Sequence, residues 1–266
     1  MTDTPIVPEP ASAGRDLRSA FHRELEQLRT DLLRLGAMTC ETVPRGTEIL
    51  LSGELGGAQD LIDGDDEIDG LSVDLEERCF TMMTLQSPVA GDLRHLITAI
   101  KLVAELERSA DLMVNVSKAA RRMYGSPMSP SIRGVVASMA KEAQRLLQLS
   151  LDAYADGDAE LAEALDDIDD QLDQLNRDMV EAIFSAHAEG QIDLAAAVQL
   201  ALIARYYERI GDHAVNIGHR VSYMVTGWLP EHTGALRAAS RHTGDEIDGD
   251  DPAPPEAVEP PMADGE

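Results

Sequence analysis

The residues of this sequence best suited to chemistry form a short acidic motif that occurs twice. Glu107-Arg108-Ser109-Ala110-Asp111 returns 101 positions later as Glu208-Arg209-Ile210-Gly211-Asp212. In both copies the acids stand four positions apart, and on a helix this spacing places both carboxylates on one face, about one turn apart. Like charges at this spacing destabilise a helix by about 0.2–0.5 kcal/mol per pair. The repetition therefore predicts a role for the acids, of which the simplest is to hold a cation between helices.

A second acidic pair precedes each motif, and the same offset of 101 residues relates its two copies. Turns at Pro88 and near Gln191 separate the pairs from the motifs that follow them. Folding back at these turns would bring pair and motif to similar heights on antiparallel helices. We therefore expect one site of four carboxylates in each half: Asp65, Asp69, Glu107 and Asp111 in the first, and Asp166, Asp170, Glu208 and Asp212 in the second.

The expected ligands are all oxygen atoms, which favours divalent or trivalent iron, manganese, magnesium or calcium over zinc or copper. Bridging carboxylates would allow more than one ion per site. The alternative is that these are ordinary acids on solvated helix faces, since such pairs are common in a chain with 49 acids. The two halves argue for metal, because neighbouring residues have diverged while the acids, the motif arginine and the asparagine one turn beyond the motif have not.

Other residues near the acids have two interpretations each. Arg108 and Arg209 either form surface ion pairs, worth under about 1 kcal/mol, or orient a metal-binding carboxylate. Asn115 and Asn216 lie one turn beyond the motifs, where they could hydrogen-bond a ligand or simply join two helices. His213 follows Asp212 directly and should point about 100° away from it, which disfavours it as a ligand.

Apolar residues recur at spacings of three and four, and no segment alternates with period two, which predicts helices and no sheet. Helices are expected from residue 15, with a bend or break at Pro44, and over 58–85, 92–123, 132–154, 159–187 and 193–225. Phe80, Val198 and Leu202 are assigned to the apolar stripes. The predicted fold is all-α, with two tandem three-helix bundles. Its parts are a disordered start (1–13), two repeats (14–124 and 131–228) and a disordered acidic tail (229–266).

The composition excludes several classes of partner. A formal net charge of −27 argues against binding to nucleic acid or to an anionic membrane. No run of 18 apolar residues is present, so insertion into a membrane is not expected. The first residues lack the basic and apolar regions of a signal peptide, and Cys40 and Cys79 are expected to be free thiols. A cytoplasmic protein is expected.

Three segments resemble the phosphate-transport regulators called PhoU. They are Gln86-Ser87-Pro88-Val89-Ala90-Gly91-Asp92-Leu93-Arg94, Ala104 to Asp111, and Glu208 to Ile217. The family pattern is a tandem repeat with an acidic signature in each half, and the first signature departs from it because Ser109-Ala110 stands in place of Ile-Gly. The resemblance implies a six-helix protein of two bundles that binds metal through the paired acids.

The resemblance also implies a role and partners. PhoU-type proteins act with the ATPase of a phosphate ABC transporter and with a sensor histidine kinase, and they repress the phosphate-starvation response. A metal-binding adaptor is therefore expected, and the long amphipathic helices could support a homodimer. The alternative is a carboxylate-bridged di-metal enzyme. Such bundles use Glu-x-x-His pairs, and none of the seven histidines has a Glu three positions before it, so a protein without enzymatic activity is favoured.

Overall fold

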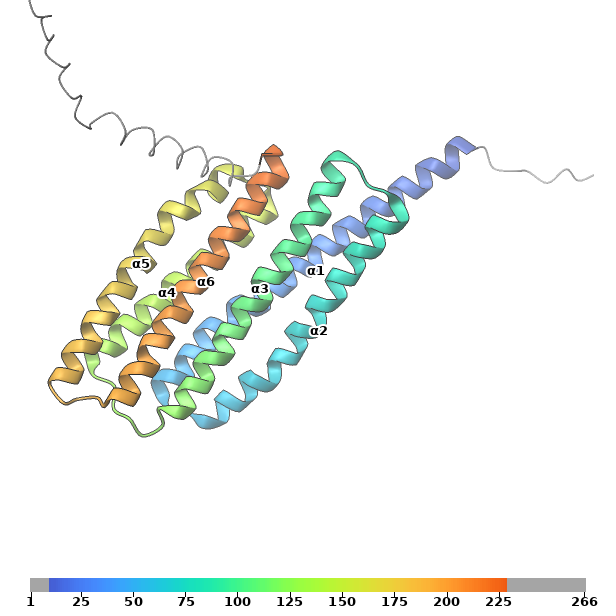
Figure 1. Cartoon of the computed structure of the whole chain (residues 1–266). Helices are drawn as coiled ribbons and strands as arrows, with labels where there is room; N and C mark the ends of the chain where they lie inside the picture. Colours follow the sequence, from blue (N-terminus) through green and yellow to red (C-terminus); the bar gives the residue numbers. More distant parts are fainter. Residues whose placement is uncertain (1–9, 229–266) are drawn as a thin grey trace, which may run out of the picture. The chain divides into compact units, whose positions relative to one another are not determined.

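The computed structural model describes residues 10–228, which fold into six helices and contain no strand (Figure 1). All six belong to one compact unit, and the all-α prediction is confirmed. The predicted tail, 229–266, and residues 1–9 lie outside the described part of the chain. The helices are α1 (Pro10–Ser52), α2 (Leu55–Gln86), α3 (Ala90–Arg122), α4 (Pro130–Asp156), α5 (Ala159–Ala188) and α6 (Leu194–Thr226).

The helices form two bundles of three, as predicted. Helices α1, α2 and α3 contact one another in the first bundle, and α4, α5 and α6 do so in the second (Figure 1). The bundles join where α3 packs against α6 and α1 packs against α4. A single apolar core runs through both, and Leu35, Leu106 and Tyr207 are fully buried in it. Cys40 and Cys79 are buried free thiols within this core.

Short polar residues and glycines set the ends of the helices in the second bundle. The Asp158 side chain accepts hydrogen bonds from the first amides of α5, and Asp193 accepts one from Ala196 in α6, which satisfies donors that have no partner inside the helix. Gly157 and Gly227 adopt left-handed backbone conformations and end α4 and α6. The turns therefore lie where the sequence places its helix breakers.

Helix α1 differs from its prediction in two respects. It includes residues 10–13, which were expected to be disordered. It also continues through Pro44, where a bend or break was expected. A proline inside a helix removes one backbone donor and costs about 3 kcal/mol. Pro44 itself is exposed, whereas Val43 and Thr47 beside it are buried, and this packing holds the helix together across the proline.

Three residues assigned to the apolar stripes lie at the surface instead. Phe80 is 52 % exposed, Val198 is 50 % exposed and Leu202 is 40 % exposed. Their spacing along the helix is compatible with burial, but each bundle has only three helices, so the outer edges of α2, α5 and α6 have no neighbour to cover them. The assignment of these three residues to the core was wrong.

Two arginines join the bundles by reciprocal contacts between α1 and α4. Arg29 of α1 donates to the carbonyl of Ala155 at the end of α4. Arg133 of α4 donates to the carbonyl of Leu51 at the end of α1, at 2.8 Å. Positively charged groups are favourable at a helix C-terminus because the last carbonyls there lack partners. Each bundle thus caps the first helix of the other, which fixes the antiparallel contact.

Candidate metal centre

In the first bundle, antiparallel α2 and α3 place the two predicted acidic pairs opposite each other. The pKa of Asp65 is raised to about 6, chiefly by burial and then by the charges of Asp69, Asp111 and Glu107, with Lys118 opposing the shift. The electrostatic influence of both α3 acids on an α2 carboxyl shows that the four groups share one neighbourhood.

The remaining shifts in the first bundle have the same origin. Burial and Asp111 raise the pKa of Asp69. Burial, Asp111 and Asp69 raise the pKa of Glu107, and Arg108 partly offsets them. Unpaired carboxylates that repel one another in this way are stabilised by a bound cation.

In the second bundle a residue that the sequence comparison overlooked lies at the centre of the acids. Asp169 is partly buried, and its pKa is raised to about 6 by burial and by Asp173, Asp212, Asp166 and Asp170, in that order. The repeat offset aligns Asp169 with the buried Ile68 of the first bundle, so comparing the halves gave no reason to select it. The acidic run from 166 to 170 was the available signal.

Glu208 has a different environment from its counterpart Glu107. Its Oε2 atom contacts Arg205 Nη1, and Arg205 Nη2 lies 3.8 Å from Asp212 Oδ2. Arg205 therefore supplies positive charge to the acids of the second motif. The first bundle has Ala104 at the equivalent position and cannot do the same. Sequence reasoning missed Arg205 because it lies outside the motif.

Two glycines bring α6 close to α5. At Gly218 a Cβ atom would lie 2.6 Å from the carbonyl oxygen of Ala162, and at Gly211 it would collide with Asp169. The first bundle carries Ser117 and Ala110 at these positions. The departure of the first motif from the Ile-Gly pattern therefore falls at a point of helix contact, where the second bundle tolerates no side chain.

The carboxylates suit a hard cation by their chemistry, but they do not form a finished coordination site. Among residues 10–228, no three Asp, Glu, His or Cys side chains converge closely enough to hold an ion. One oxygen is nevertheless ready to accept an ion: Asp169 Oδ1 is buried without a hydrogen bond in the described structure. Asp69, Asp111, Asp166 and Asp170 are exposed, so their side chains can rotate toward a bound ion.

The neighbouring residues singled out in the sequence lie beside the acids. Arg108 is exposed and pairs with Glu105, 3.6 Å away, rather than with its motif acids. Arg209 is exposed, Asn115 is partly buried, and Asn216 lines a cavity between α3 and α6.

His213 faces the contact between the bundles. It is buried, and its Nδ1 atom lies 3.0 Å from Ser109 Oγ on α3. Its Nε2 atom is 3.9 Å from Glu105 Oε2. Burial and the charges of Arg209 and Arg108 lower the pKa of His213 to about 4, so the ring is neutral at pH 7. It therefore contributes to the packing of α6 on α3.

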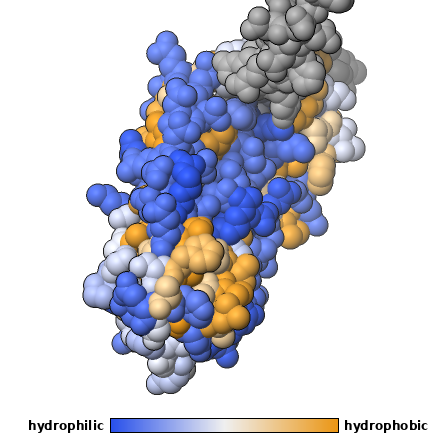
Figure 2. Space-filling model, turned by 60° about the vertical axis from the view of Figure 1, so that its left-hand side comes forward, coloured by the Kyte–Doolittle hydropathy of each residue, from blue (hydrophilic) through white to orange (hydrophobic). Residues whose placement is uncertain are grey.

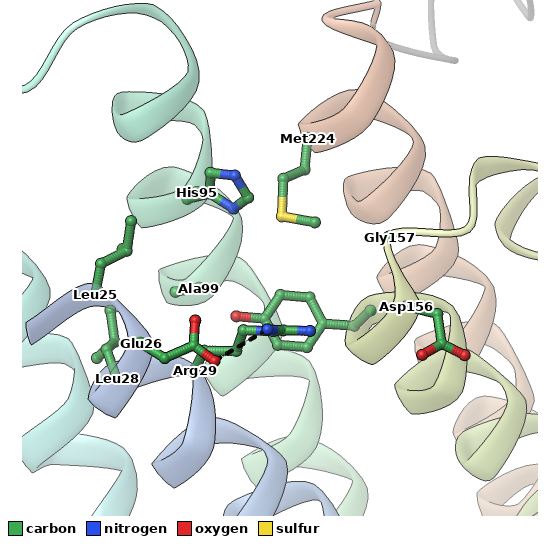
Figure 3. A pocket seen from close by; sticks show the side chains of 10 residues that line it. Leu25, Glu26, Leu28, Arg29, His95, Ala99, Asp156, Gly157 and Met224 are labelled. Atoms are coloured by element: carbon green, nitrogen blue, oxygen red, sulfur yellow. Dashed lines mark hydrogen bonds and ion pairs between the residues drawn. The ribbon is translucent and has the colours of Figure 1, made fainter. Parts of the chain in front are cut away.

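A separate cavity of about 250 Å³ lies where both bundles meet (Figure 3). Arg29 of α1 and Glu26 pair across one side of it, at 3.1 Å. His95 of α3 and Met224 of α6 lie together at the opposite side in Figure 3. Arg29 and Glu26 neutralise each other here, so the cavity has no excess charge from this pair.

Known protein families match each half of the chain separately. The profile of the PhoU domain matches residues 32–120 and again residues 136–221. The chain is 33 % identical over 215 residues to the phosphate-specific transport system accessory protein PhoU homolog 1 of Mycobacterium tuberculosis, covering 80 % of this chain and 96 % of the relative. It is 34 % identical to PhoU homolog 2 of that organism, covering 80 % and 100 %.

Solved structures show the same fold. The crystal structure of PhoU from Pseudomonas aeruginosa matches with a TM-score of 0.73 and 30 % identity, over 78 % of this chain and 100 % of that one. The phosphate transport system regulatory protein PhoU from Streptococcus pneumoniae matches with a TM-score of 0.72 and 26 % identity, over 79 % and 98 %.

Proposed function

Because the chain belongs to the PhoU family, we propose that it is a regulatory accessory protein of phosphate transport. In this proposal it acts in the cytoplasm as an adaptor between the transporter ATPase and a sensor histidine kinase, and it restrains the phosphate-starvation response. The observation that carries the proposal is the family match over both halves, with relatives named as accessory proteins of the phosphate-specific transport system.

An adaptor needs a surface on which a protein partner can dock, and the α5–α6 turn supports such a role. Figure 2 brings the left-hand side of Figure 1 forward and shows apolar side chains gathered on the lower part of the molecule. Phe184 is 71 % exposed and Leu194 is 67 % exposed. Exposed apolar clusters favour protein contacts. We call this cluster the α5–α6 apolar patch: Val180, Phe184, Leu194, Val198 and Leu202.

The names of the relatives indicate which kind of partner the patch would contact. In the described part of the chain no helix is long and apolar enough to cross a membrane. Relatives are named as accessory proteins of the phosphate-specific transport system, and the patch would serve for contact with a protein of such a system. The acidic body disfavours direct binding to an anionic membrane, because both carry negative charge.

Metal ions bound by the acidic pairs would strengthen this scaffold rather than perform a reaction. A cation between α2 and α3, or between α5 and α6, would relieve the carboxylate repulsion and tie the helices together. The chain offers no Glu-x-x-His pair of the kind that di-metal bundle enzymes use. We therefore favour a regulator over the alternative of a di-metal enzyme. Oxygen consumption by the iron-loaded protein would support the enzyme instead.

Affinity capture from membranes tests the adaptor role. The tagged full-length chain is incubated with solubilised membranes of its source organism grown in high and in low phosphate, and the retained proteins are identified by mass spectrometry. We expect the transporter ATPase and the histidine kinase, most strongly from high-phosphate cells. Retention of neither protein under either condition would refute the proposal.

Variants of the patch sharpen the test. Phe184→Ser with Leu194→Ser should reduce retention at least about tenfold, because buried aromatic and aliphatic anchors dominate interface energies. Phe80→Ser is a matched control, since Phe80 is 52 % exposed and lies on α2 in the other bundle. Both variants should keep the melting temperature of the parent. The expected homodimer stays a prediction, which analytical ultracentrifugation of the same samples would test.

A further inference from the structure

Two adjoining cavities form one groove beside the first acidic site. One has a volume of about 380 Å³ and lies between α2 and α3, and the other, of about 360 Å³, extends from there to α6. They share Glu76, Ala104 and Arg108 in their walls. The groove therefore runs from the first bundle to the second across α3. We call it the α3 groove.

One end of the α3 groove carries acids from the candidate metal centre. Asp69 and Glu107 line it there, beside Ser72. The Ser72 side chain is buried, and its Oγ atom has no hydrogen-bond partner within the described structure. A buried hydroxyl without a partner is costly, so this end of the groove is suited to a polar ligand.

The other end of the groove is basic, although the chain as a whole is strongly acidic. Lys101, Arg108 and Arg220 line it together with the Asn216 amide. Two acids, Glu76 and Glu105, line the same cavity, so the three basic residues leave a positive excess of one charge there, in a chain with 22 lysines and arginines against 49 acids. Charged donors of this kind make the strong hydrogen bonds that oxyanions accept.

One buried acceptor also points to the kind of oxyanion. Glu105 lines the basic end, and its Oε2 atom is buried without a hydrogen bond in the described structure. The recorded neighbour of that oxygen is the neutral ring of His213, whose Nε2 atom lies 3.9 Å away, beyond hydrogen-bond distance. A carboxylate among basic residues repels sulfate, which has no proton to donate at pH 7. Hydrogen phosphate retains a proton and can donate it to this oxygen.

We propose that the α3 groove binds inorganic phosphate. Lys101, Arg108 and Arg220 donate to its oxygens, and Glu105 accepts a hydrogen bond from its protonated oxygen. The inference rests on the proposed function in one respect: a metal ion held by Asp69 and Glu107 adds positive charge at the acidic end, so phosphate and metal bind cooperatively. Binding of phosphate across the groove would link the two bundles. The regulator would then sense directly the ion that the transporter carries.

Isothermal titration calorimetry of the full-length chain with phosphate tests the proposal, with and without excess Mg²⁺ at pH 7. We expect saturable phosphate binding that Mg²⁺ strengthens, and at least about tenfold weaker binding of sulfate, as the loss of a charge-assisted hydrogen bond predicts. Absence of saturable phosphate binding in the presence of Mg²⁺, or equal affinity for sulfate, would overturn it.

Three variants locate the site. Lys101→Gln should weaken phosphate binding about tenfold by removing a charged donor. Glu105→Gln keeps the shape of the side chain but replaces one acceptor oxygen with a donor, so it should reduce the preference for phosphate over sulfate. Lys141→Gln, an exposed site on α4, is the matched control and should bind like the parent. Unchanged phosphate affinity in Lys101→Gln would exclude the groove.

The outcome separates this inference from the proposed function. Circular dichroism confirms that each variant is folded, and affinity capture from membranes is measured on the same preparations. A chain that retains the transport proteins but does not bind phosphate would refute the phosphate site alone. A chain that binds phosphate in the groove but retains neither partner would refute the adaptor role alone.

Discussion

At the scale of single residues, the two partly buried aspartates report best on the state of the acidic clusters. The pKa values of Asp65 and Asp169 are raised to about 6, first by burial and then by neighbouring acids. A raised carboxyl pKa means that the folded protein binds the proton more tightly than the unfolded chain. The stabilisation of the fold that comes from this proton binding is complete below the pKa of the unfolded chain, 3.8, and is lost as the pH rises through the pKa of the folded protein, about 6.

Asp65→Asn tests this electrostatic cost in metal-free protein. The amide cannot ionise, so the variant should be more stable than the parent at pH 7, and the difference should shrink steadily as the pH falls toward 4. Urea denaturation at several pH values in the presence of a chelator measures it. The exposed Asp60→Asn is the control. A difference that is independent of pH would show that Asp65 does not carry the predicted charge repulsion.

At the scale of helices, the spacing between α5 and α6 depends on small residues. Gly218 of α6 lies against the backbone of Ala162, and Gly211 lies against Asp169. These contacts bring the α6 acids close to the aspartates of α5, which is how Asp212 comes to raise the pKa of Asp169. The helix contact thus controls the electrostatics of the second acidic cluster.

Gly218→Ala should force the two helices apart. Its Cβ atom would lie 2.6 Å from the Ala162 carbonyl oxygen, and overpacking of this kind costs about 1–3 kcal/mol of unfolding free energy. Gly134→Ala in α4 is the control, because nothing lies within 4 Å of its added Cβ and alanine favours a helix by about 0.8–1.0 kcal/mol. Urea denaturation should therefore give opposite signs for the two substitutions. Equal stabilisation by both would contradict the close contact.

At the scale of the whole molecule, the duplication produces two acidic clusters with unequal cation requirements. Arg205 already supplies charge to Glu208 and Asp212. The first cluster has Ala104 at that position, and its nearby cations, Lys118 and Arg108, only partly offset the repulsion between its acids. We therefore predict that metal binds more tightly in the first bundle than in the second.

Metal removal and replacement test this asymmetry. Chelation should lower the melting temperature, and excess metal should restore it, with stabilisation of about 2.7 kcal/mol at a hundredfold excess over the dissociation constant. Glu107→Ala with Asp111→Ala should remove more bound metal than Glu208→Ala with Asp212→Ala, as measured by elemental analysis. Arg205→Ala should raise metal content, whereas Arg122→Ala, at an exposed position at the end of α3 and outside both motifs, serves as its control. Metal content that none of these variants alters would refute the carboxylate sites.

The sequence alone determined the helices, their order and the duplication, because helix periodicity, breakers and repeat offsets are local properties of the chain. It also placed each acidic pair on one helix face, since that depends only on a spacing of four. Only the tertiary structure decided which charges meet across helices. Asp169 is affected by Asp212 of α6, and Arg205 pairs with Glu208 and Asp212. Neither residue is part of the repeated spacing that identified the other acids. It likewise decided that Phe80, Val198 and Leu202 are exposed and that a basic groove crosses α3, because burial and distance depend on which helices pack together.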